Sequence, residues 1–454
     1  MSLSDRLNRN EPDLATPQAF PGTGMLRQIS TGTPTRVDIT QIRNEVNDEL
    51  KELIGQQLYS GDVDANSLQS TVFKAIGIVI ERANYPLTDT DRAELVQEIV
   101  DDILGNGPLE QLLRDPEVTE IMVARYDRIF VEKRGKLVQT ELRFTEEEHL
   151  RKTIDRIVGK VGRRIDESSP LVDARLKDGS RVNAVVPPIA LDGANLTIRK
   201  FFKDPFTAKD MVNTGTLSVN AVGFLHAAVQ GRMNIVISGG TGSGKTTTLN
   251  VVSSFIPDDE RIVTIEDSAE LQLNKPHVIR LETRPQNIEG TGLVTIRDLV
   301  RNSLRMRPDR IVVGEVRDGA ALDMLQAMNT GHDGSLTTVH ANSTTDAVSR
   351  LETMALMAGM DMPMSAIRDQ VGRAVNLIVQ QSRMRDGSRK ITAVSEVVGV
   401  RENQVYMEDI FKFEYNNDPN SAVIGTLMPT GRRPAFLERL AQRGILVPDE
   451  VFQR

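Results

Sequence analysis

Apolar residues recur through residues 38–105 at the three- and four-residue spacing of amphipathic helices. They fall into three groups, the last of which stops at Gly105: Ile39, Ile42, Val46, Leu50, Leu53 and Ile54; Val72, Ile76, Val79 and Ile80; and Leu95, Ile99 and Ile103. Three such helices predict a small helical bundle, suited to docking rather than to chemistry. Residues 1–37 show no periodicity and carry prolines among Gly, Ser and Thr, so we expect a disordered arm there.

Short alternating runs replace the helical spacing in residues 106–205. The runs lie at 120–123, 129–132, 136–138, 181–186 and 196–201, and the turn signals RGK, KDGS and LDGAN separate them. A helix-like segment lies near 146–162. This pattern predicts an α+β domain, followed by a linker over residues 206–216.

From about residue 217 to residue 415, apolar strands are separated by helical runs. The expected buried strands are 235–238, 262–266, 311–314 and 336–339. Their rhythm predicts an α/β fold with a mostly parallel sheet and helices on both faces. Residues 416–454 contain NNDPNSA and PTGRRP around a short helix, and we expect a peripheral C-terminal tail.

Composition narrows the class of protein. The 454 residues are too many for one core, and no apolar window is long enough for a membrane span. The N-terminal segment lacks the apolar core of a secretory signal, and the absence of cysteine agrees with a reducing cytoplasm. A formal net charge of -8, no tryptophan and 4% aromatic residues argue against a broad nucleic-acid-binding surface, so we expect no nucleic-acid partner, although these totals are compatible with a local basic lining.

The segment SGGTGSGKTTTL carries the clearest chemistry. Gly239-x4-Gly244-Lys245-Thr246 follows a predicted strand and precedes a predicted helix, which is the context of a phosphate-binding P-loop. Glycines let backbone amides converge on phosphate, Lys245 should reach the β- and γ-phosphates, and the Thr246 hydroxyl should bind Mg²⁺. The expected ATP-binding residues are Gly239, Gly240, Thr241, Gly242, Ser243, Gly244, Lys245, Thr246 and Thr247.

Acidic residues follow two of the predicted strands. DRIVVGEVRD ends in Gly314 and Glu315, and RIVTIEDSAEL delivers Glu266, Asp267 and Glu270. Carboxyl ends of parallel strands face a bound ligand, so these acids are candidates for metal positioning and water activation. Taken alone, each cluster is also compatible with a helix cap or a solvated turn.

His332 and His340 flank the threonine-rich strand of TGHDGSLTTVHANS. A metal site is a weak interpretation, because no third ligand is evident. The open alternatives are a structural role for either histidine and a role as γ-phosphate sensor or relay at the end of the sheet.

Four segments in this order resemble the type II and type IV secretion ATPase superfamily. After the P-loop, TIEDSAEL is similar to its aspartate box, IVVGEVRD to its atypical Walker B segment and TGHDGSLTTVHA to its histidine box. Upstream, GPLEQLLRDPEVTEIMV, VDARLKDGSRVNAVVPP and LTIRKF resemble the tight-adherence (Tad/Flp) pilus ATPases of the CpaF/TadA type. The resemblance covers roughly residues 40–450. It departs at Ala124 and Arg125, where relatives usually carry asparagine and glycine.

The resemblance implies a RecA-like P-loop NTPase domain preceded by an α+β (PAS-like) domain, with ATP between the two, in a ring commonly of six subunits. It implies that Glu315 helps to hold Mg²⁺, directly or through water, and that Glu266 and Glu270 orient or activate the attacking water. Arginines of the N-terminal domain would neutralise phosphate charge, and the matching candidates are Arg175, Arg181 and Arg199. Arg199 and its neighbour Lys200 are the preferred pair.

The function that this resemblance implies is Mg²⁺-dependent ATP hydrolysis that powers pilus assembly, or secretion through an inner-membrane complex. Closing and opening of the two domains would turn phosphate contacts into motion. The implied partners are further copies of the chain and inner-membrane platform proteins, with the protein at the cytoplasmic face of that membrane. The alternatives are a DNA-transfer ATPase of a type IV secretion system and a nucleotide-gated scaffold that does not hydrolyse ATP.

Overall fold

The computed structural model describes residues 45–46, 48–49, 65–83, 89–103, 105–133, 135–201, 206–284, 286, 291–416 and 425–454. By compactness the chain divides into two units, Met1–Leu95 and Val96–Arg454. The predicted disordered arm lies outside the described residues, as does most of the first predicted helix. The other two predicted helices are confirmed as α3 (Ala65–Ala83) and α4 (Asp89–Ile103). In α3 the predicted apolar positions Ile76, Val79 and Ile80 are buried, and Ala75 is buried with them.

The first sheet of the larger unit is antiparallel and has the strand order β3-β2-β1-β6-β5-β4. Its strands are β1 (Val118–Arg125), β2 (Arg128–Lys133), β3 (Lys136–Gln139), β4 (Leu171–Arg175), β5 (Arg181–Val185) and β6 (Asn195–Arg199). Helices α5 (Leu109–Arg114) and α6 (Glu147–Gly159) pack into the same apolar core. The sequence did not predict β4, because it is an edge strand whose first residue, Leu171, is exposed.

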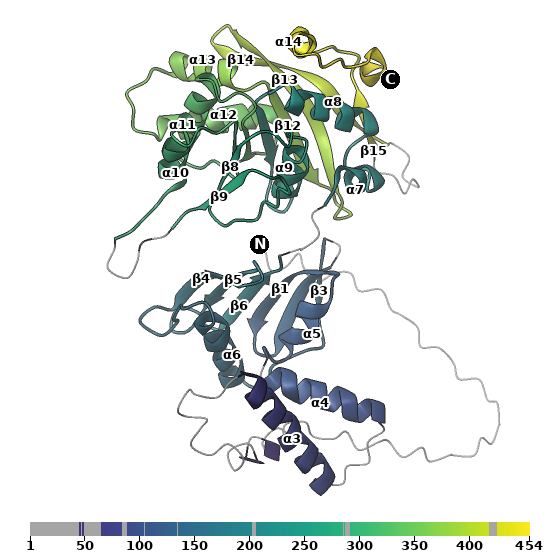
Figure 1. The fold of residues 1–454 in the computed structure, drawn as a ribbon, viewed down its shortest axis with the longest axis vertical. Coiled ribbons are helices and arrows are strands. Elements are labelled where there is room, and N and C mark those ends of the chain that lie inside the picture. Colours follow the sequence, from purple (N-terminus) through teal and green to yellow (C-terminus); the bar gives the residue numbers. More distant parts are fainter. Residues whose placement is uncertain are drawn as a thin grey trace, which may run out of the picture. The chain divides into compact units, whose positions relative to one another are not determined.

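The second sheet has nine strands in the order β15-β14-β13-β12-β7-β11-β10-β8-β9 (Figure 1). Strands from β12 to β9 in this order pair in parallel, and β12 to β15 pair antiparallel. The strands are β7 (Ile235–Gly239), β8 (Ile262–Glu266), β9 (Val278–Glu282), β10 (Arg310–Val313), β11 (Leu336–His340), β12 (Leu377–Arg383), β13 (Arg389–Arg401), β14 (Gln404–Tyr415) and β15 (Gly425–Pro429). This is the mostly parallel α/β sheet of a RecA-like P-loop domain.

Helices cover both faces of the nine-stranded sheet, as the sequence predicts. One apolar core holds α10 (Ile296–Ser303), α11 (Ala320–Asn329), α12 (Thr344–Leu356) and α13 (Met364–Ala374) (Figure 1). The other core holds α7 (Ala208–Asn213), α8 (Val219–Gln230), α9 (Lys245–Ser253) and α14 (Leu437–Gln442). The four predicted buried strands correspond to β7, β8, β10 and β11.

Two segments contribute more to this domain than their sequences indicated. The predicted linker contains α7, which a Thr207–Asp210 capping box begins and whose Met211 is buried in the core. The last forty residues are not peripheral, because β15 extends the sheet and Phe436 and Phe452 pack against Phe224. Aromatic burial of this kind is a tertiary effect that local sequence does not reveal.

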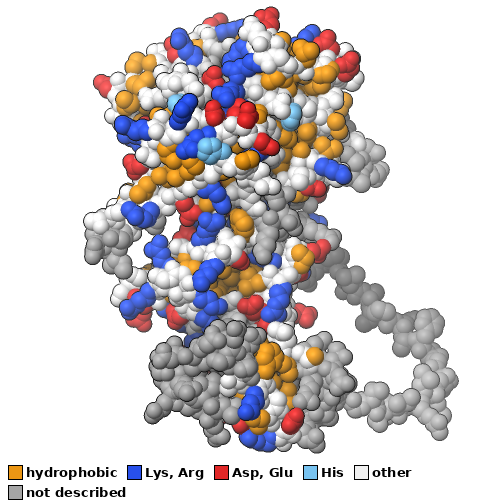
Figure 2. Space-filling view, viewed as in Figure 1, with side chains coloured by type: hydrophobic (Ala, Val, Ile, Leu, Met, Phe, Trp, Pro, Cys, Tyr) orange, Lys and Arg blue, Asp and Glu red, His pale blue; other side chains and the backbone are white. Residues whose placement is uncertain are grey.

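The visible surface mixes acidic, basic and apolar side chains without one continuous basic field (Figure 2). Within the described part of the chain, no helix combines the length and the apolar composition that a membrane crossing requires.

Candidate functional site

The predicted P-loop joins the end of β7 to the start of α9. Gly242 and Gly244 have φ values of 68° and 96°, in the left-handed region that favours glycine. Gly239 is required for space, since a Cβ there would lie 2.6 Å from the carbonyl oxygen of Gln381. The loop therefore takes a conformation that these glycines permit, and it delivers Lys245 and Thr246 to the first turn of α9.

Lys245 lies across the loop that precedes it. Its Nζ donates a hydrogen bond to the Gly240 carbonyl oxygen at 3.1 Å. Burial lowers the pKa of Lys245, and the neighbouring carboxylate of Glu315 opposes that shift. Arg317 and Arg199 also act on this pKa and lower it. One carboxylate, that of Glu315, and two guanidinium groups, those of Arg317 and Arg199, are therefore close enough to Lys245 to affect its pKa.

Glu315 follows β10 through Gly314. A Cβ on Gly314 would lie 3.0 Å from Cγ of Glu266, so glycine allows the ends of β10 and β8 to approach closely. This packing explains why glycine, rather than a second acid, precedes Glu315. The Glu315 carboxylate accepts a hydrogen bond from Arg317 at 2.7 Å, and Arg317 also pairs with Asp267 at 3.3 Å.

The two glutamates of the aspartate-box segment have different environments. Glu266 is only 3% exposed, and its Oε2 accepts the backbone N–H groups of Glu270 at 2.7 Å and Leu271 at 2.9 Å. Burial raises the pKa of Glu266 to about 7, although these two N–H groups lower it. Glu266 thus shapes the turn that carries Glu270, and Glu270 is the acid that reaches the arginines.

Five charged residues form one row across the six-stranded sheet, which we call the charged row. Their order in cross-strand register is Arg175, Arg181, Arg199, Glu120 and Glu132, on β4, β5, β6, β1 and β2. Like charges directly opposite each other destabilise a sheet, so three arginines in register require anions facing them.

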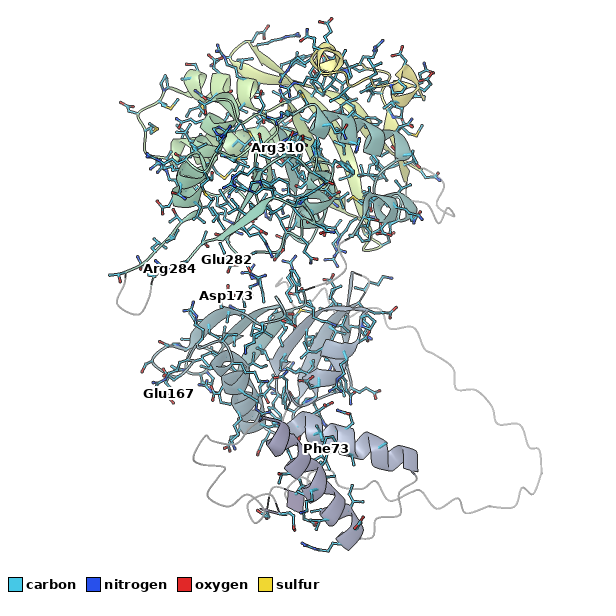
Figure 3. The ribbon with its side chains drawn as sticks, viewed as in Figure 1. Phe73, Glu167, Asp173, Glu282, Arg284 and Arg310 are labelled. Atoms are coloured by element: carbon cyan, nitrogen blue, oxygen red, sulfur yellow. The ribbon has the colours of Figure 1, made fainter. Side chains whose placement is uncertain are left out.

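The nine-stranded domain supplies an anion to each of the three, and Asp173 of β4 adds one within the sheet, 3.2 Å from Arg181. Arg199 and Arg181 lie 3.4 Å and 3.9 Å from Glu270, and Arg175 lies 2.9 Å from Glu282. A cavity of about 810 Å³ adjoins these pairs, and Asp173, Glu282 and Arg284 line it (Figure 3). The structure thus brings all three predicted arginines to the acidic strand ends.

Lys200 does not belong to this group, and its pairing with Arg199 is corrected. Successive residues of a strand point to opposite faces, so Lys200 turns away from the charged row. Its Nζ donates to the backbone carbonyl oxygens of Asp115 at 2.6 Å and Leu112 at 3.4 Å.

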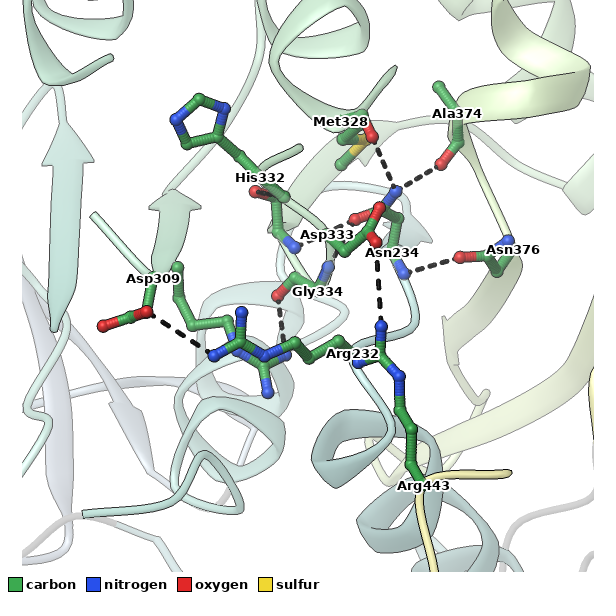
Figure 4. A network of polar contacts seen from close by, with 12 residues as sticks. Arg232, Asn234, Asp309, Met328, His332, Asp333, Gly334, Ala374, Asn376 and Arg443 are labelled. Atoms are coloured by element: carbon green, nitrogen blue, oxygen red, sulfur yellow. Dashed lines mark hydrogen bonds and ion pairs between the residues drawn. The ribbon is translucent and has the colours of Figure 1, made fainter. Parts of the chain in front are cut away.

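The two histidines lie at opposite ends of β11. His340 ends the strand and lies beside Gly239 in the register with β7, next to the P-loop. His332 precedes the strand, in a turn near Asn234 and Arg232 at the other end of the sheet (Figure 4). The interpretation of His332 as a phosphate sensor is therefore wrong, because the length of β11 separates it from the loop. Among the described residues, no group of three His, Asp or Glu side chains could hold a metal ion.

The turn near His332 serves a structural network that closes this end of the sheet. Arg310 is fully buried and donates to Glu260, to the Gly334 carbonyl oxygen at 3.1 Å and to the Val229 carbonyl oxygen at 2.8 Å. Asn234 accepts the N–H groups of Gly334 and Ser335. A buried arginine is stable only when its donors are paired in this way.

Gly334→Ala is expected to destabilise this network. Gly334 has φ +84°, and a Cβ there would overlap Arg310 Nη1. Gly331 is a matched control, with φ +96° and no atom within 4 Å of its Cβ position. We expect losses of about 3 kcal/mol for Gly334→Ala and about 1 kcal/mol for Gly331→Ala. Thermal unfolding of both variants measures the difference, and equal losses would contradict the proposed overlap.

Three residues next to the P-loop were not found from the sequence. Gln381, Arg383 and Arg389 lie on β12 and β13, and β12 pairs in parallel with β7. Gln381 Oε1 accepts a hydrogen bond from the Thr248 hydroxyl at 2.7 Å, and Arg389 Nε donates to the Gly242 carbonyl oxygen at 3.1 Å. They belong to no motif and lie more than 130 residues from the loop, so only the strand order brings them there.

A model of the family described as "Type II/IV secretion system protein" matches residues 102–409. The chain belongs to this family. The match to the family begins in α4 and ends within β14. It therefore includes the six-stranded sheet, the nine-stranded sheet up to β14, the P-loop, the acidic strand ends, and His332 and His340.

Proteins similar to this chain include conjugal transfer and type IV secretion proteins. A putative conjugal transfer protein of Mycobacterium tuberculosis is 34% identical over 348 residues, which cover 75% of this chain and 98% of the relative. The type IV secretion system protein VirB11 of Bartonella henselae is 31% identical over 331 residues, covering 63% and 90%. The crystal structure of the VirB11 ATPase from the Brucella suis type IV secretion system, in complex with sulphate, is 31% identical with a TM-score of 0.35 and covers 63% and 94%.

The residues at the P-loop fit the ATP and Mg²⁺ that the family implies. The loop has the glycine geometry of a phosphate cradle, and Thr246 and Glu315 offer the oxygen ligands that Mg²⁺ prefers. Glu315 lies close enough to Lys245 to act on its pKa. Metal and phosphate would therefore lie beside each other at this end of the sheet.

Proposed function

We propose that this chain is a Mg²⁺-dependent ATPase that drives a secretion or pilus-assembly machine. One observation supports this most strongly: Lys245 of the P-loop is near enough to Glu315 and Arg199 for both charges to act on its pKa, and Arg199 pairs with Glu270. Two cations that could bind phosphate, Lys245 and Arg199, thus lie at the same end of the sheet as two acids. Of these acids, Glu315 is suited to binding the metal and Glu270 to orienting water. Nucleotide binding alone would not need this second acid.

In the proposed reaction, the loop amides and Lys245 would hold the β- and γ-phosphates, and Thr246 and Glu315 would hold Mg²⁺. The metal neutralises charge on the phosphates when it is bound. Arg199 and Arg181 exchange Glu270 for the γ-phosphate, because a phosphate carries more negative charge and more acceptor oxygens than a single carboxylate at 3.4 Å and 3.9 Å. Glu270, released from the arginines, then orients the attacking water, and His340 lies at the same strand end.

When Arg199 and Arg181 exchange their carboxylate partner for phosphate, ATP binding is coupled to motion between the two domains. These arginines belong to the six-stranded sheet, whereas Lys245 and Glu270 belong to the nine-stranded domain. Binding and loss of the γ-phosphate would therefore alter the force between the two domains. In a ring of six copies at the cytoplasmic face of the inner membrane, such strokes would act on membrane-embedded partner proteins.

The proposed branch is the tight-adherence pilus ATPases, on the resemblance of residues 107–123 and 172–201. DNA transfer is the second candidate, because relatives that match most of their own length are named conjugal transfer proteins. The formal net charge of -8 favours a protein substrate over a nucleic acid, which requires basic surface.

Purified full-length chain tests both candidates in one experiment. We expect ATP turnover that needs Mg²⁺, and a particle about six times the 50.3 kDa chain mass when ATP is present. Turnover is then measured with single- and double-stranded DNA at several salt concentrations.

Each outcome of that experiment selects one function. Unchanged turnover with DNA supports pilus assembly, and turnover that DNA stimulates and salt suppresses selects DNA transfer. ATP binding by the assembled particle without turnover would contradict the ATPase proposal and select a nucleotide-gated scaffold.

A further inference from the structure

Two hairpin turns from different sheets meet beside the P-loop. Gly135 lies in the β2–β3 turn and Gly387 in the β12–β13 turn, with φ values of 76° and 87°. A Cβ on Gly135 would lie 2.9 Å from the Gly387 carbonyl oxygen, so the two backbones approach as closely as glycine permits. Arg383, at the end of β12, donates a hydrogen bond to the Gly135 carbonyl oxygen.

Arg389 extends this contact to the P-loop itself. Its Nε donates to the Gly242 carbonyl oxygen at 3.1 Å, and its Nη2 lies 3.2 Å from Glu132 Oε1. Glu132 is the last member of the charged row, on the strand next to Glu120. One guanidinium therefore connects the phosphate-binding loop to the sheet that carries Arg199.

We propose that Arg389 is a positioning residue for ATP hydrolysis, which fixes the P-loop against Glu132 and so places Arg199 opposite Lys245. This inference rests on the proposed ATPase function. Arg389 donates its hydrogen bond to a carbonyl oxygen of the P-loop, that of Gly242. The backbone N–H groups of the loop, which bind phosphate, are therefore left available. The bond from Arg389 to the loop thus persists while a nucleotide is bound.

The two ends of the charged row differ in what ATP does to them. At the arginine end, Arg199 and Arg181 lie 3.4 Å and 3.9 Å from Glu270, which competes with phosphate for them. Arg181 also pairs with Asp173 of its own sheet at 3.2 Å. At the glutamate end, the Glu132 carboxylate repels phosphate and keeps Arg389 as its partner at 3.2 Å. The glutamate end is thus a fixed anchor, and the arginine end exchanges its partner when ATP binds.

Loss of this anchor affects hydrolysis more than nucleotide affinity. Lys245 and the loop amides still bind the nucleotide, but the row that carries Arg199 no longer stays opposite the γ-phosphate. We therefore expect kcat to fall and the Kd for ADP to change by less than about threefold. A residue that bound nucleotide directly would change both.

Charge reversal tests the anchor. Glu132→Arg and Arg389→Glu each replace an attraction by a repulsion, and each is expected to lower kcat about tenfold. The double reversal, Glu132→Arg with Arg389→Glu, restores the ion pair between the two sheets but not the hydrogen bond to the Gly242 carbonyl oxygen, because a carboxylate cannot donate. It is therefore expected to restore the distance between the domains and to raise kcat at least about threefold above either single reversal, without full recovery. Arg454→Glu is the matched control, because Arg454 pairs with Glu414 at 2.9 Å away from the loop.

A second measurement does not depend on hydrolysis. The chain has no cysteine, so spin labels can be placed at Lys152→Cys on α6 and Tyr415→Cys on β14 alone. Pulsed electron resonance then reports the distance between the two domains. We expect a narrow distribution for the unaltered chain and the double reversal, and a broad one for each single reversal.

The outcomes separate the two proposals. If the unaltered chain has no turnover, but the single reversals broaden the distance distribution and the double reversal narrows it again, the ATPase function is contradicted and the anchor is supported. Single reversals that leave kcat and the distances unchanged would overturn the anchor, as would a double reversal that recovers neither. Loss of ADP affinity in Arg389→Glu that Glu132→Arg does not repair would instead make Arg389 a direct nucleotide ligand.

Discussion

Lys245→Ala is expected to lower ATP turnover by at least about a thousandfold, which corresponds to about 4 kcal/mol of transition-state stabilisation. In the structure, the Lys245 ammonium is the cation that the P-loop itself supplies, and it donates a hydrogen bond to the Gly240 carbonyl oxygen. No other residue of the loop carries a positive charge. The amides remain after the substitution, so nucleotide binding weakens less than turnover.

The measurement is steady-state ATP hydrolysis by the full-length chain, with Lys412→Ala as the control. Lys412 lies on β14 and is largely exposed, so its removal tests the loss of a lysine without loss of the loop cation. Equal melting temperatures for the two variants would show that the fold is intact. Turnover by Lys245→Ala within tenfold of the control would contradict the assigned site.

The RecA-like core was predictable because its strands are buried on both faces. Strands such as β7 and β8 read as continuous apolar runs between helices, which is the pattern of a covered parallel sheet. The antiparallel half was missed for a physical reason. Its longest strand, β13, has register shifts near Ser395 and Gly399, and such bulges break the alternation that identifies a strand.

Motifs identified which residue types form the site, but not which way each one points. Glu266 and Glu270 look equivalent in sequence, yet one is buried under the turn and the other reaches Arg199. Lys200 follows Arg199 directly and points to the opposite face. Face and strand end are set by register and strand direction, which a single motif does not contain.

Residues outside motifs were not predictable at all. Arg389 lies beside Gly242 because β12 pairs with β7, and that pairing joins segments far apart in the chain. The phosphate-binding chemistry of a P-loop can be read from a short stretch of sequence, whereas its supporting contacts depend on topology. The same limit applies to Glu132, whose importance follows only from its place in the charged row.

Glu266 gives the second large prediction, a dependence of stability on pH. Burial raises its pKa in the folded chain from 4.5 to about 7. Between these values the folded chain binds more protons than the unfolded chain, so the Glu266 contribution falls as pH rises from 4.5 to about 7 and stays constant above that. The loss is about 3 kcal/mol over this window. Glu266→Gln cannot ionise and should not show it.

Melting temperatures between pH 5 and pH 8 test this prediction. The melting temperature of Glu266→Gln is expected to rise relative to that of the unaltered chain as pH increases. Glu438→Gln, at an exposed position in α14, should have the same pH dependence of melting temperature as the unaltered chain. A constant difference between Glu266→Gln and the unaltered chain would show that Glu266 does not titrate in this range.

Ionisation of Glu266 should raise ATP turnover, although it lowers the stability of the fold. An ionised Glu266 is the stronger acceptor for the N–H groups of Glu270 and Leu271, and it therefore holds Glu270 more firmly above about pH 7 than below it. We expect turnover of the unaltered chain to rise as pH passes through about 7, and Glu266→Gln to be at least about tenfold slower and without this rise. The buried carboxylate that costs the fold stability at neutral pH is then the group that keeps the water-activating acid in position. A variant as fast as the unaltered chain at pH 8 would separate these two roles and leave Glu270 to be positioned by Arg199 and Arg181 alone.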